Sequence, residues 1–251
     1  MSTQRVAWLS PDDSPESFPD VDSALHEPDG LLAVGGDLGI ERLLNAYRRG
    51  IFPWYDEGQP ILWWAPDPRC ILRPCDLRVS KRLARYARRS PLTLRFNTAF
   101  GAVIRTCAGV RESQRRTWIT AEMIAAYEQL HADAWAHSVE VWDHEQLVGG
   151  LYGLCIGRVF FGESMFSAVD NASKFAMLGL ASQMLSHDLE LIDCQVISQH
   201  LMTMGATTIP RHEFTALLSA LCQPPRPFTD WPDDALSIAD SLQVWCSAAL
   251  Q

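Results

Sequence analysis

Residues 159–196 read VFFGESMF-SAVDN-ASKFAMLGLASQMLSH-DLELIDCQV, and the fold is best predicted from this stretch outward. Its first part is an apolar run typical of a β-strand. A polar turn follows, and then a helical run from Ala172 to His187 and a second short strand from Leu189 to Val196. The pattern predicts a strand–helix–strand unit.

Both predicted strands carry acidic or amide side chains among apolar neighbours. Because strand side chains alternate between faces, Phe161, Glu163 and Met165 are predicted to share one face of the first strand. By the same rule Asp193 and Gln195 share one face of the second. A buried carboxylate is costly unless it has a partner or a task, so these positions are candidates for function.

Glu163, Asp193 and Gln195 are therefore the candidate catalytic residues. A carboxylate within hydrogen-bond reach of an amine can accept its proton or hold its ammonium form. The structural alternative is that Asp193 caps a neighbouring helix and Glu163 forms an ion pair, because structural networks also contain buried acids. The pattern alone leaves both interpretations open.

The composition is that of a soluble globular protein, with 251 residues, 47% hydrophobic residues and a net charge of -9. An acidic chain contacts nucleic acid only through a local basic patch. The N-terminus lacks an apolar signal core, and no run approaches the roughly 18 apolar residues of a membrane span, so a cytoplasmic protein without membrane contact is expected. Cys70 and Cys75 have no second pair or nearby histidine, so no metal site is expected.

Outward from the opening stretch, residues 121–221 predict a helix, a three-strand meander, a helix, a strand, a helix and a strand. This is an α+β layout with a mainly antiparallel sheet, similar in element order to the acetyltransferase-like (GNAT) fold. Acetyl-CoA enzymes of that fold carry a glycine-rich loop where the strand meets the helix. The joint at Phe166–Asn171 has no glycine, so acetyl-CoA is not expected.

Three parts of the chain are predicted. Residues 1–68 form a small N-terminal α+β domain that would be marginal alone, with a boundary near Pro68. Residues 69–222 form the acetyltransferase-like domain. Residues 223–251 form a Pro-rich C-terminal tail with one weak helical run.

A basic helix follows the predicted boundary, with Ser80 as its cap. Five cations and no acid lie on it: Lys81, Arg82, Arg85, Arg88 and Arg89. Such a helix can bind phosphates, or it can be an ordinary solvated face. Concentration of positive charge in an acidic chain favours neither alternative decisively.

Several sequence motifs, taken together, resemble those of leucyl/phenylalanyl-tRNA–protein transferases. They are EPDGLLAVGGDL at 27–38, GIFPW at 50–54, PILWW at 60–64, PDPR at 66–69, TWIT at 117–120, GESMFS at 162–167 and IDCQ at 192–195. The resemblance implies an aminoacyltransferase with a Fem-type fold, which moves Leu or Phe from leucyl-tRNA or phenylalanyl-tRNA to proteins with an N-terminal Arg or Lys. This marks the acceptor for N-end-rule degradation. The resemblance also implies a monomer and no cofactor, because the donor ester is already activated.

The resemblance also implies roles for individual residues. Asp193 and Gln195 would assist the attacking amine, and Glu163 would hold a cationic or amine group. The pocket for the donor side chain would be shaped by Trp54, Trp118, Leu151, Met165, Phe166 and Ile192, with Trp54 beside the 3′ adenosine. The basic helix would bind tRNA. The alternatives are a Fem-type transferase with another acceptor and a non-catalytic aminoacyl-tRNA-binding protein.

Overall fold

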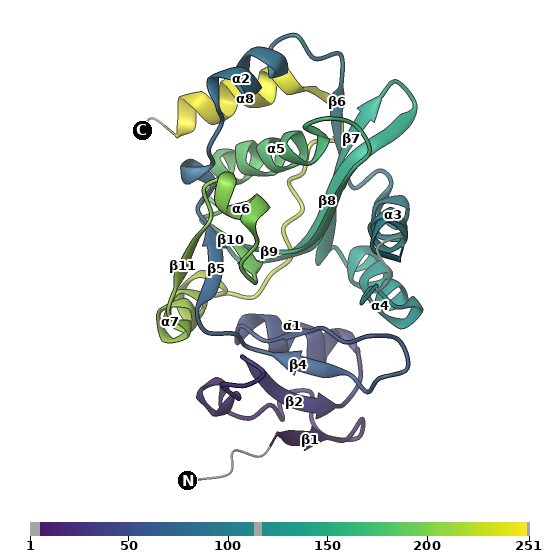
Figure 1. Ribbon diagram of the computed structural model, residues 1–251, viewed down its shortest axis with the longest axis vertical. Coiled ribbons are helices and arrows are strands. Elements are labelled where there is room, and N and C mark those ends of the chain that lie inside the picture. Colours follow the sequence, from purple (N-terminus) through teal and green to yellow (C-terminus); the bar gives the residue numbers. More distant parts are fainter. Residues whose placement is uncertain (1–5, 113–116, 250–251) are drawn as a thin grey trace.

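The computed structural model describes residues 6–112 and 117–249, which form two β-sheets with helices around them (Figure 1). The smaller sheet has the strand order β1-β2-β4-β3. Its elements are β1 (Ala7–Leu9), β2 (Leu31–Gly35), β3 (Phe52–Pro53) and β4 (Leu62–Trp64), with the helices η1 (Val21–Ser23) and α1 (Ile40–Arg48). Helix α1 lies between this sheet and the larger one.

The larger sheet has the order β11-β5-β10-β9-β8-β7-β6-β12. Its strands are β5 (Arg69–Leu72), β6 (Thr93–Phe96), β7 (Ala136–Asp143), β8 (Gln146–Ile156), β9 (Val159–Ser167), β10 (Leu191–Gln195), β11 (Thr207–Ile209) and β12 (Leu236–Ser237). Within the described chain, β9 and β10 pair in parallel and the other neighbours pair antiparallel. The predicted meander and mainly antiparallel sheet are confirmed.

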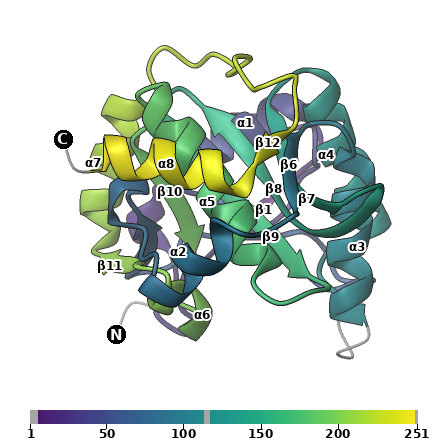
Figure 2. The same cartoon turned by 90° about the horizontal axis from the view of Figure 1, so that it is seen from above.

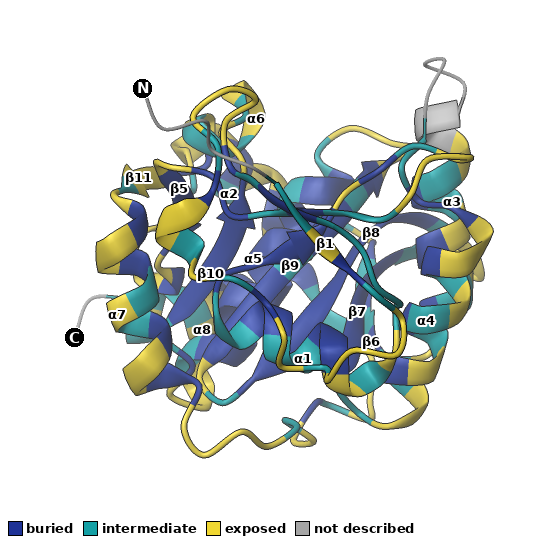
Figure 3. Cartoon of the chain, turned by 90° about the horizontal axis from the view of Figure 1, so that it is seen from below, coloured by how far each residue is buried: buried dark blue, intermediate teal, exposed yellow. Residues whose placement is uncertain are grey.

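Helices cover both faces of the larger sheet (Figures 1 and 2). One face carries α2 (Lys81–Ala87), α5 (Ala172–Ser186) and α8 (Ile238–Ala248), and the other carries α3 (Phe100–Glu112), α4 (Ala121–Ala132) and α1. Three further elements, η2 (Pro74–Asp76), α6 (Gln199–Thr203) and α7 (Arg211–Leu221), surround β5 and β11. The central strands are buried on both faces, as Figure 3 shows, because each face has its own apolar core. None of the described helices is both long and apolar enough to cross a membrane.

The segment after Cys222 belongs to this same layered structure. Strand β12 pairs with β6 at the edge of the larger sheet, and α8 packs on α5. Trp231 from the connecting segment is buried against the rings of Phe96 and Phe228. The C-terminal residues therefore complete the core on the α5 face.

Two irregular strands create a gap in the larger sheet. The β9–β10 pairing ends at Phe161 and Asp193. The β8–β9 register skips Glu163, and the β5–β10 register skips Cys194, next to Gln195 with φ of 60°. Such bulges bend a strand and re-aim its side chains. Beyond this point β9 and β10 no longer pair with each other, and a cavity lies between them.

The bulge at Glu163 overturns one prediction about the faces of β9. Phe161 packs in the core on the α1 and α3 face, whereas Met165 packs against the core on the α5 face. The predicted shared face of Phe161, Glu163 and Met165 is therefore wrong. Strict alternation applies only to a strand without an extra residue.

Candidate active site

A cavity of about 370 Å³ lies where β9 and β10 separate. Its walls are mainly apolar, and its polar lining includes Glu163, Asp193 and Gln195. Most of its lining comes from β9, β10, α5 and the segment after β10, and the smaller sheet contributes Phe52 and Pro53 of β3, with Trp54 directly after them. This combination of apolar walls and few polar groups is the usual form of a small-molecule site.

Asp193 is fully buried and forms an ion pair with Arg69 of β5. Arg69 Nε lies 2.8 Å from Oδ1 of Asp193 and Nη2 lies 2.7 Å from Oδ2, so both carboxylate oxygens accept a bond. Such a bidentate pair has a fixed geometry and is stronger than a neutral hydrogen bond. Asp193 is thus neither the cap of a helix, as the structural alternative held, nor an unpaired base.

The ion pair is enclosed by both parts of the molecule. Arg69 donates through Nη1 to the carbonyl oxygen of Gly50 at 3.0 Å. Its guanidinium lies between the rings of Phe52 and Phe214, 4.8 and 4.7 Å from the two centroids. These contacts favour a guanidinium over an ammonium at this position, because only the planar group stacks and forks together.

Asp193 also sets the direction of Gln195. Its Oδ1 accepts the backbone N–H of Gln195 at 2.9 Å, inside the bulge. Gln195 then donates from its side-chain Nε2 to Oε1 of Glu163 at 2.6 Å. The three predicted catalytic residues are therefore connected in one chain of hydrogen bonds. The side chain of Asp193 pairs with Arg69, whereas the side chain of Gln195 pairs with Glu163.

Glu163 is the group in this chain that remains chemically available. Tyr47 of α1 donates to Oε1 of Glu163 at 2.6 Å, and the hydroxyl of Tyr127 in α4 contacts that of Tyr47. The second oxygen, Oε2, is buried with no hydrogen-bond partner among the described residues, and Glu163 lines the cavity. The described chain shows no ion pair at Glu163, contrary to its structural alternative.

Burial raises the pKa of Glu163 to about 7, although the bonds from Tyr47, Tyr127 and Gln195 favour the charged form. Burial also raises the pKa of both tyrosines well above the ordinary value. The tyrosines thus remain proton donors while Glu163 titrates. A carboxylate with a pKa near 7 can accept and return a proton at neutral pH.

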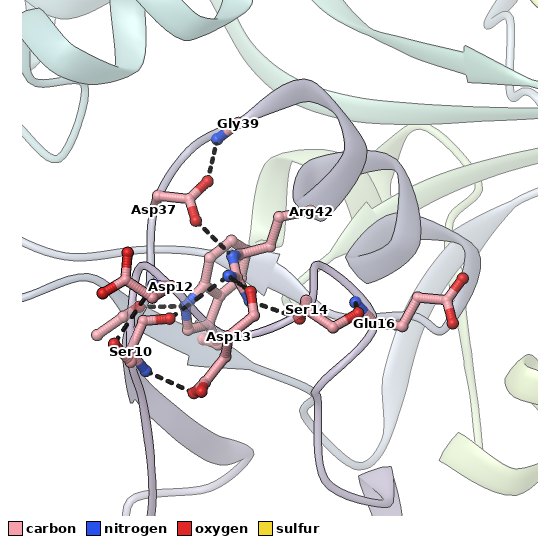
Figure 4. A network of polar contacts seen from close by, with 10 residues as sticks. Ser10, Asp12, Asp13, Ser14, Glu16, Asp37, Gly39 and Arg42 are labelled. Atoms are coloured by element: carbon pink, nitrogen blue, oxygen red, sulfur yellow. Dashed lines mark hydrogen bonds and ion pairs between the residues drawn. The ribbon is translucent and has the colours of Figure 1, made fainter.

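Helix α1, which supplies Tyr47, is held in place from its outer side. Figure 4 shows Arg42, buried to 1% exposure, bonded to Asp37 at 2.8 Å and to the carbonyl oxygen of Asp13 at 2.8 Å. Arg49 follows Arg42 by seven residues, about two helical turns. It donates to the carbonyl oxygens of Phe18 and Pro19 at 3.1 and 2.6 Å. The segment before η1 is thereby fastened to α1.

Five of the six predicted pocket residues line the cavity: Trp54, Trp118, Leu151, Met165 and Ile192. Trp54 lies 41% exposed at its rim, with its ring 5.9 Å from that of Trp64. Phe166 does not line the cavity, because it lies on the other face of β9 from Met165 and packs in the core with α3. The prediction for Phe166 is wrong for that reason.

A second hollow, the basic groove, runs between α2 and the β9–α5 joint, with a volume of about 1070 Å³. The Ser80 hydroxyl caps α2 as predicted, accepting the N–H of Leu83 at 3.1 Å. Arg82, Arg85 and Arg89 line the groove, whereas Lys81 and Arg88 do not. The predicted phosphate-binding helix thus has a groove side and an outer side.

Sequence reasoning missed Arg69, Tyr47 and Tyr127. Arg69 had a signal, because it begins an apolar strand whose buried cation requires an anion elsewhere. The two tyrosines had none, since both fit the apolar faces of their helices.

Two family models match the chain. The model described as leucyl/phenylalanyl-tRNA protein transferase matches residues 71–219, and the model of that family's N-terminal domain matches residues 36–67. Relatives that match most of the chain carry the name leucyl/phenylalanyl-tRNA–protein transferase. The one from Azotobacter vinelandii is 55% identical over 80% of this chain and 89% of its own. The one from Cellvibrio japonicus is 50% identical over 89% and 94%, and the one from Methylococcus capsulatus is 54% identical over 85% and 91%.

Proposed function

The chain belongs to the leucyl/phenylalanyl-tRNA–protein transferase family, and from this premise we propose which acceptors it uses and how its residues act. It is an aminoacyltransferase that takes Leu or Phe from aminoacyl-tRNA to a protein. The proposed acceptors are proteins with an N-terminal Arg or Lys, which are thereby marked for N-end-rule degradation.

The observation that carries the mechanism is the buried, unpartnered Oε2 of Glu163 at an apolar cavity. The cavity takes the Leu or Phe side chain of the donor, which places the ester carbonyl near Glu163 and Gln195. The α-amine of the acceptor attacks that carbonyl, so a C–N bond forms and the ester C–O bond breaks. Glu163 accepts the amine proton, and the departing ribose oxygen takes up a proton.

Asp193 acts through Gln195 in this mechanism. Its charge is matched by Arg69, and its Oδ1 holds the Gln195 backbone, so Asp193 is a positioning residue and not the base. Gln195 keeps an amide oxygen that can accept a hydrogen bond from the incoming amine. Together these residues orient the reactants, which is a large part of catalysis when the donor is already an activated ester.

We also infer an acetyltransferase-like fold of the Fem type for residues 69–222, with residues 1–68 as an N-terminal domain. The support is the meander β7–β9, followed by α5 and by a parallel strand that separates from β9 at the site. A monomer in the cytoplasm, without a cofactor, fits the proposed reaction.

The direct test is transfer of radiolabelled leucine from leucyl-tRNA to a peptide with an N-terminal Arg. The matched control is the same peptide with an acetylated N-terminus, which has no amine to attack the ester. Label in the first peptide and none in the control is expected. Tight tRNA binding without any transfer would support the non-catalytic alternative, and label in a cell-wall precursor would support the Fem-type acceptor.

Removal of the groove-side cations should reduce the salt dependence of tRNA binding. The variant with Arg82, Arg85 and Arg89 replaced by Ala loses about three phosphate contacts, so the slope of log K against log salt should become shallower by about three. The variant with Lys81 and Arg88 replaced by Ala is the control, since these two residues do not line the groove. Titrations at several salt concentrations measure both, and equal slopes in the two variants would exclude the groove.

A further inference from the structure

The basic groove and the apolar cavity meet at one side chain. His200 of α6 lines both hollows. The rim of the cavity next to it is formed by Val196, Ser198 and Leu201, which follow directly after Gln195 of β10. Any chain that leaves the cavity toward the groove therefore passes His200.

The groove has a cationic wall on each side at this junction. Helix α2 supplies Arg82 and Arg85, the turn after it supplies Arg89, and α5 supplies Lys174 opposite them. Asp170 is the acidic residue among the described groove residues. Burial and then the charge of Lys174 lower the pKa of His200, which shows that the two side chains lie within electrostatic reach of each other.

An aromatic surface is available in the same groove. Tyr86 is 46% exposed, and its ring stacks on Phe175 of α5, with a centroid distance of 5.7 Å and an interplanar angle of 21°. One face of the Tyr86 ring is therefore covered by Phe175, and the other face is open to the groove. Cations that track a phosphate chain, combined with an exposed ring for a base, are typical of single-stranded nucleic-acid sites.

The proposed reaction sets the direction of the bound strand. The ester links the amino acid to the ribose of the last nucleotide, so that nucleotide lies at the mouth of the cavity. The phosphates of the preceding nucleotides must leave the mouth along a path, and the groove past His200 is the path with matching charge.

We propose that Lys174 and His200 bind the phosphates of the last nucleotides of the tRNA 3′ end, with Tyr86 stacking one of its bases. This inference rests on the proposed function and adds a binding site for the single-stranded end to that of α2. It requires that Lys174 and His200 strengthen the binding of donors with phosphates more than the binding of the aminoacyl ester itself.

The test compares two donors, the leucyl ester of the trinucleotide CCA and the leucyl ester of adenosine, which has no phosphate. Replacing Lys174 and His200 by Ala should raise KM for leucyl-CCA about tenfold, because two phosphate contacts are lost. KM for leucyl-adenosine should rise much less than KM for leucyl-CCA, because leucyl-adenosine has no phosphate. The matched control is the double variant Arg226→Ala with His212→Ala, two exposed residues that line neither hollow.

Two results would overturn the proposal. One is an equal rise in KM for both donors, which would mean that the residues shape the cavity. The other is an unchanged KM for leucyl-CCA.

A binding measurement separates this inference from the proposed reaction. Fluorescence anisotropy with an uncharged RNA hairpin ending in CCA needs no transfer. The Lys174 and His200 double variant should bind this RNA more weakly than the Arg226 and His212 control. Adding Tyr86→Ala to the double variant should weaken RNA binding further, whereas adding Tyr86→Phe should not. If wild-type protein binds this RNA as described but transfers nothing, the reaction is wrong and the strand site stands; if all these variants bind it equally, the strand site is wrong.

Discussion

Replacing Arg69 by Ala should lower the free energy of unfolding by about 3–5 kcal/mol, the usual cost of leaving one charge of a buried pair without its partner. Arg69 is 1% exposed and Asp193 is fully buried, so water cannot take over either role. The rings of Phe52 and Phe214 also lose the guanidinium between them. Urea unfolding, with the slope checked for two-state behaviour, measures the change.

A double variant separates the stability of the pair from its catalytic use. Arg69→Met combined with Asp193→Leu leaves no buried charge, so it should be more stable than either single variant. Transfer should nevertheless be lost, because no side chain then accepts the backbone N–H of Gln195. A double variant that transfers leucine at the wild-type rate would show that the position of Gln195 does not depend on Asp193.

Replacing Glu163 by Gln should reduce kcat by about 100-fold or more, because the group that accepts the amine proton is removed. The shape of the side chain and its bond from Tyr47 can be kept, so the loss should fall on kcat more than on KM for the donor. Glu213→Gln, an exposed acid on α7, is the matched control and should transfer leucine normally. A Glu163→Gln enzyme with near-normal kcat would mean that substrate orientation carries the rate.

The pH dependence of this site has a definite sign. Only ionised Glu163 accepts a proton, and its pKa is raised to about 7, so wild-type kcat should rise as pH passes through 7. In the Gln variant this step should be missing, leaving the ionisation of the acceptor amine at about 7.7–8.0.

Stability should change in the opposite direction. The folded protein holds the Glu163 proton up to a pH of about 7, whereas the unfolded chain releases it near the ordinary pKa of 4.5. The free energy of unfolding should therefore fall by about 3 kcal/mol between those two values, and Glu163→Gln should remove that part of the fall. Urea midpoints at pH 5 and pH 8 measure it.

The sequence pattern predicted the elements well where apolar periodicity is long. The meander, the helix from Ala172 and the short strand that follows were all recognisable, because burial of one face leaves a regular pattern. The acids on β9 and β10 were also recognisable as unusual. The C-terminal helix was only a weak signal and strand β12 was not predicted, since both depend on the surfaces that α5 and β6 offer them.

The hydrogen bonds and ion pairs of the site could not be predicted from the local sequence pattern. Arg69 and Asp193 are 124 positions apart, and Tyr47 and Glu163 are 116 apart, so neither pair leaves a local periodicity. The bulges at Glu163 and Cys194 also have no period of their own. A strand that gains one residue re-aims each later side chain, and for that reason Phe161 and Met165 were wrongly placed on one face.

The guanidinium of Arg69 has a consequence for how the chain folds. It joins Gly50 and Phe52 next to the smaller sheet, Asp193 in the larger one and Phe214 on α7. Arg69 and Asp193 both belong to the larger sheet, so loss of the smaller sheet would remove the Gly50 carbonyl and the Phe52 ring and leave the buried ion pair uncovered. Residues 7–64 and the larger sheet should therefore melt in a single cooperative transition, although the family models assign them to separate domains.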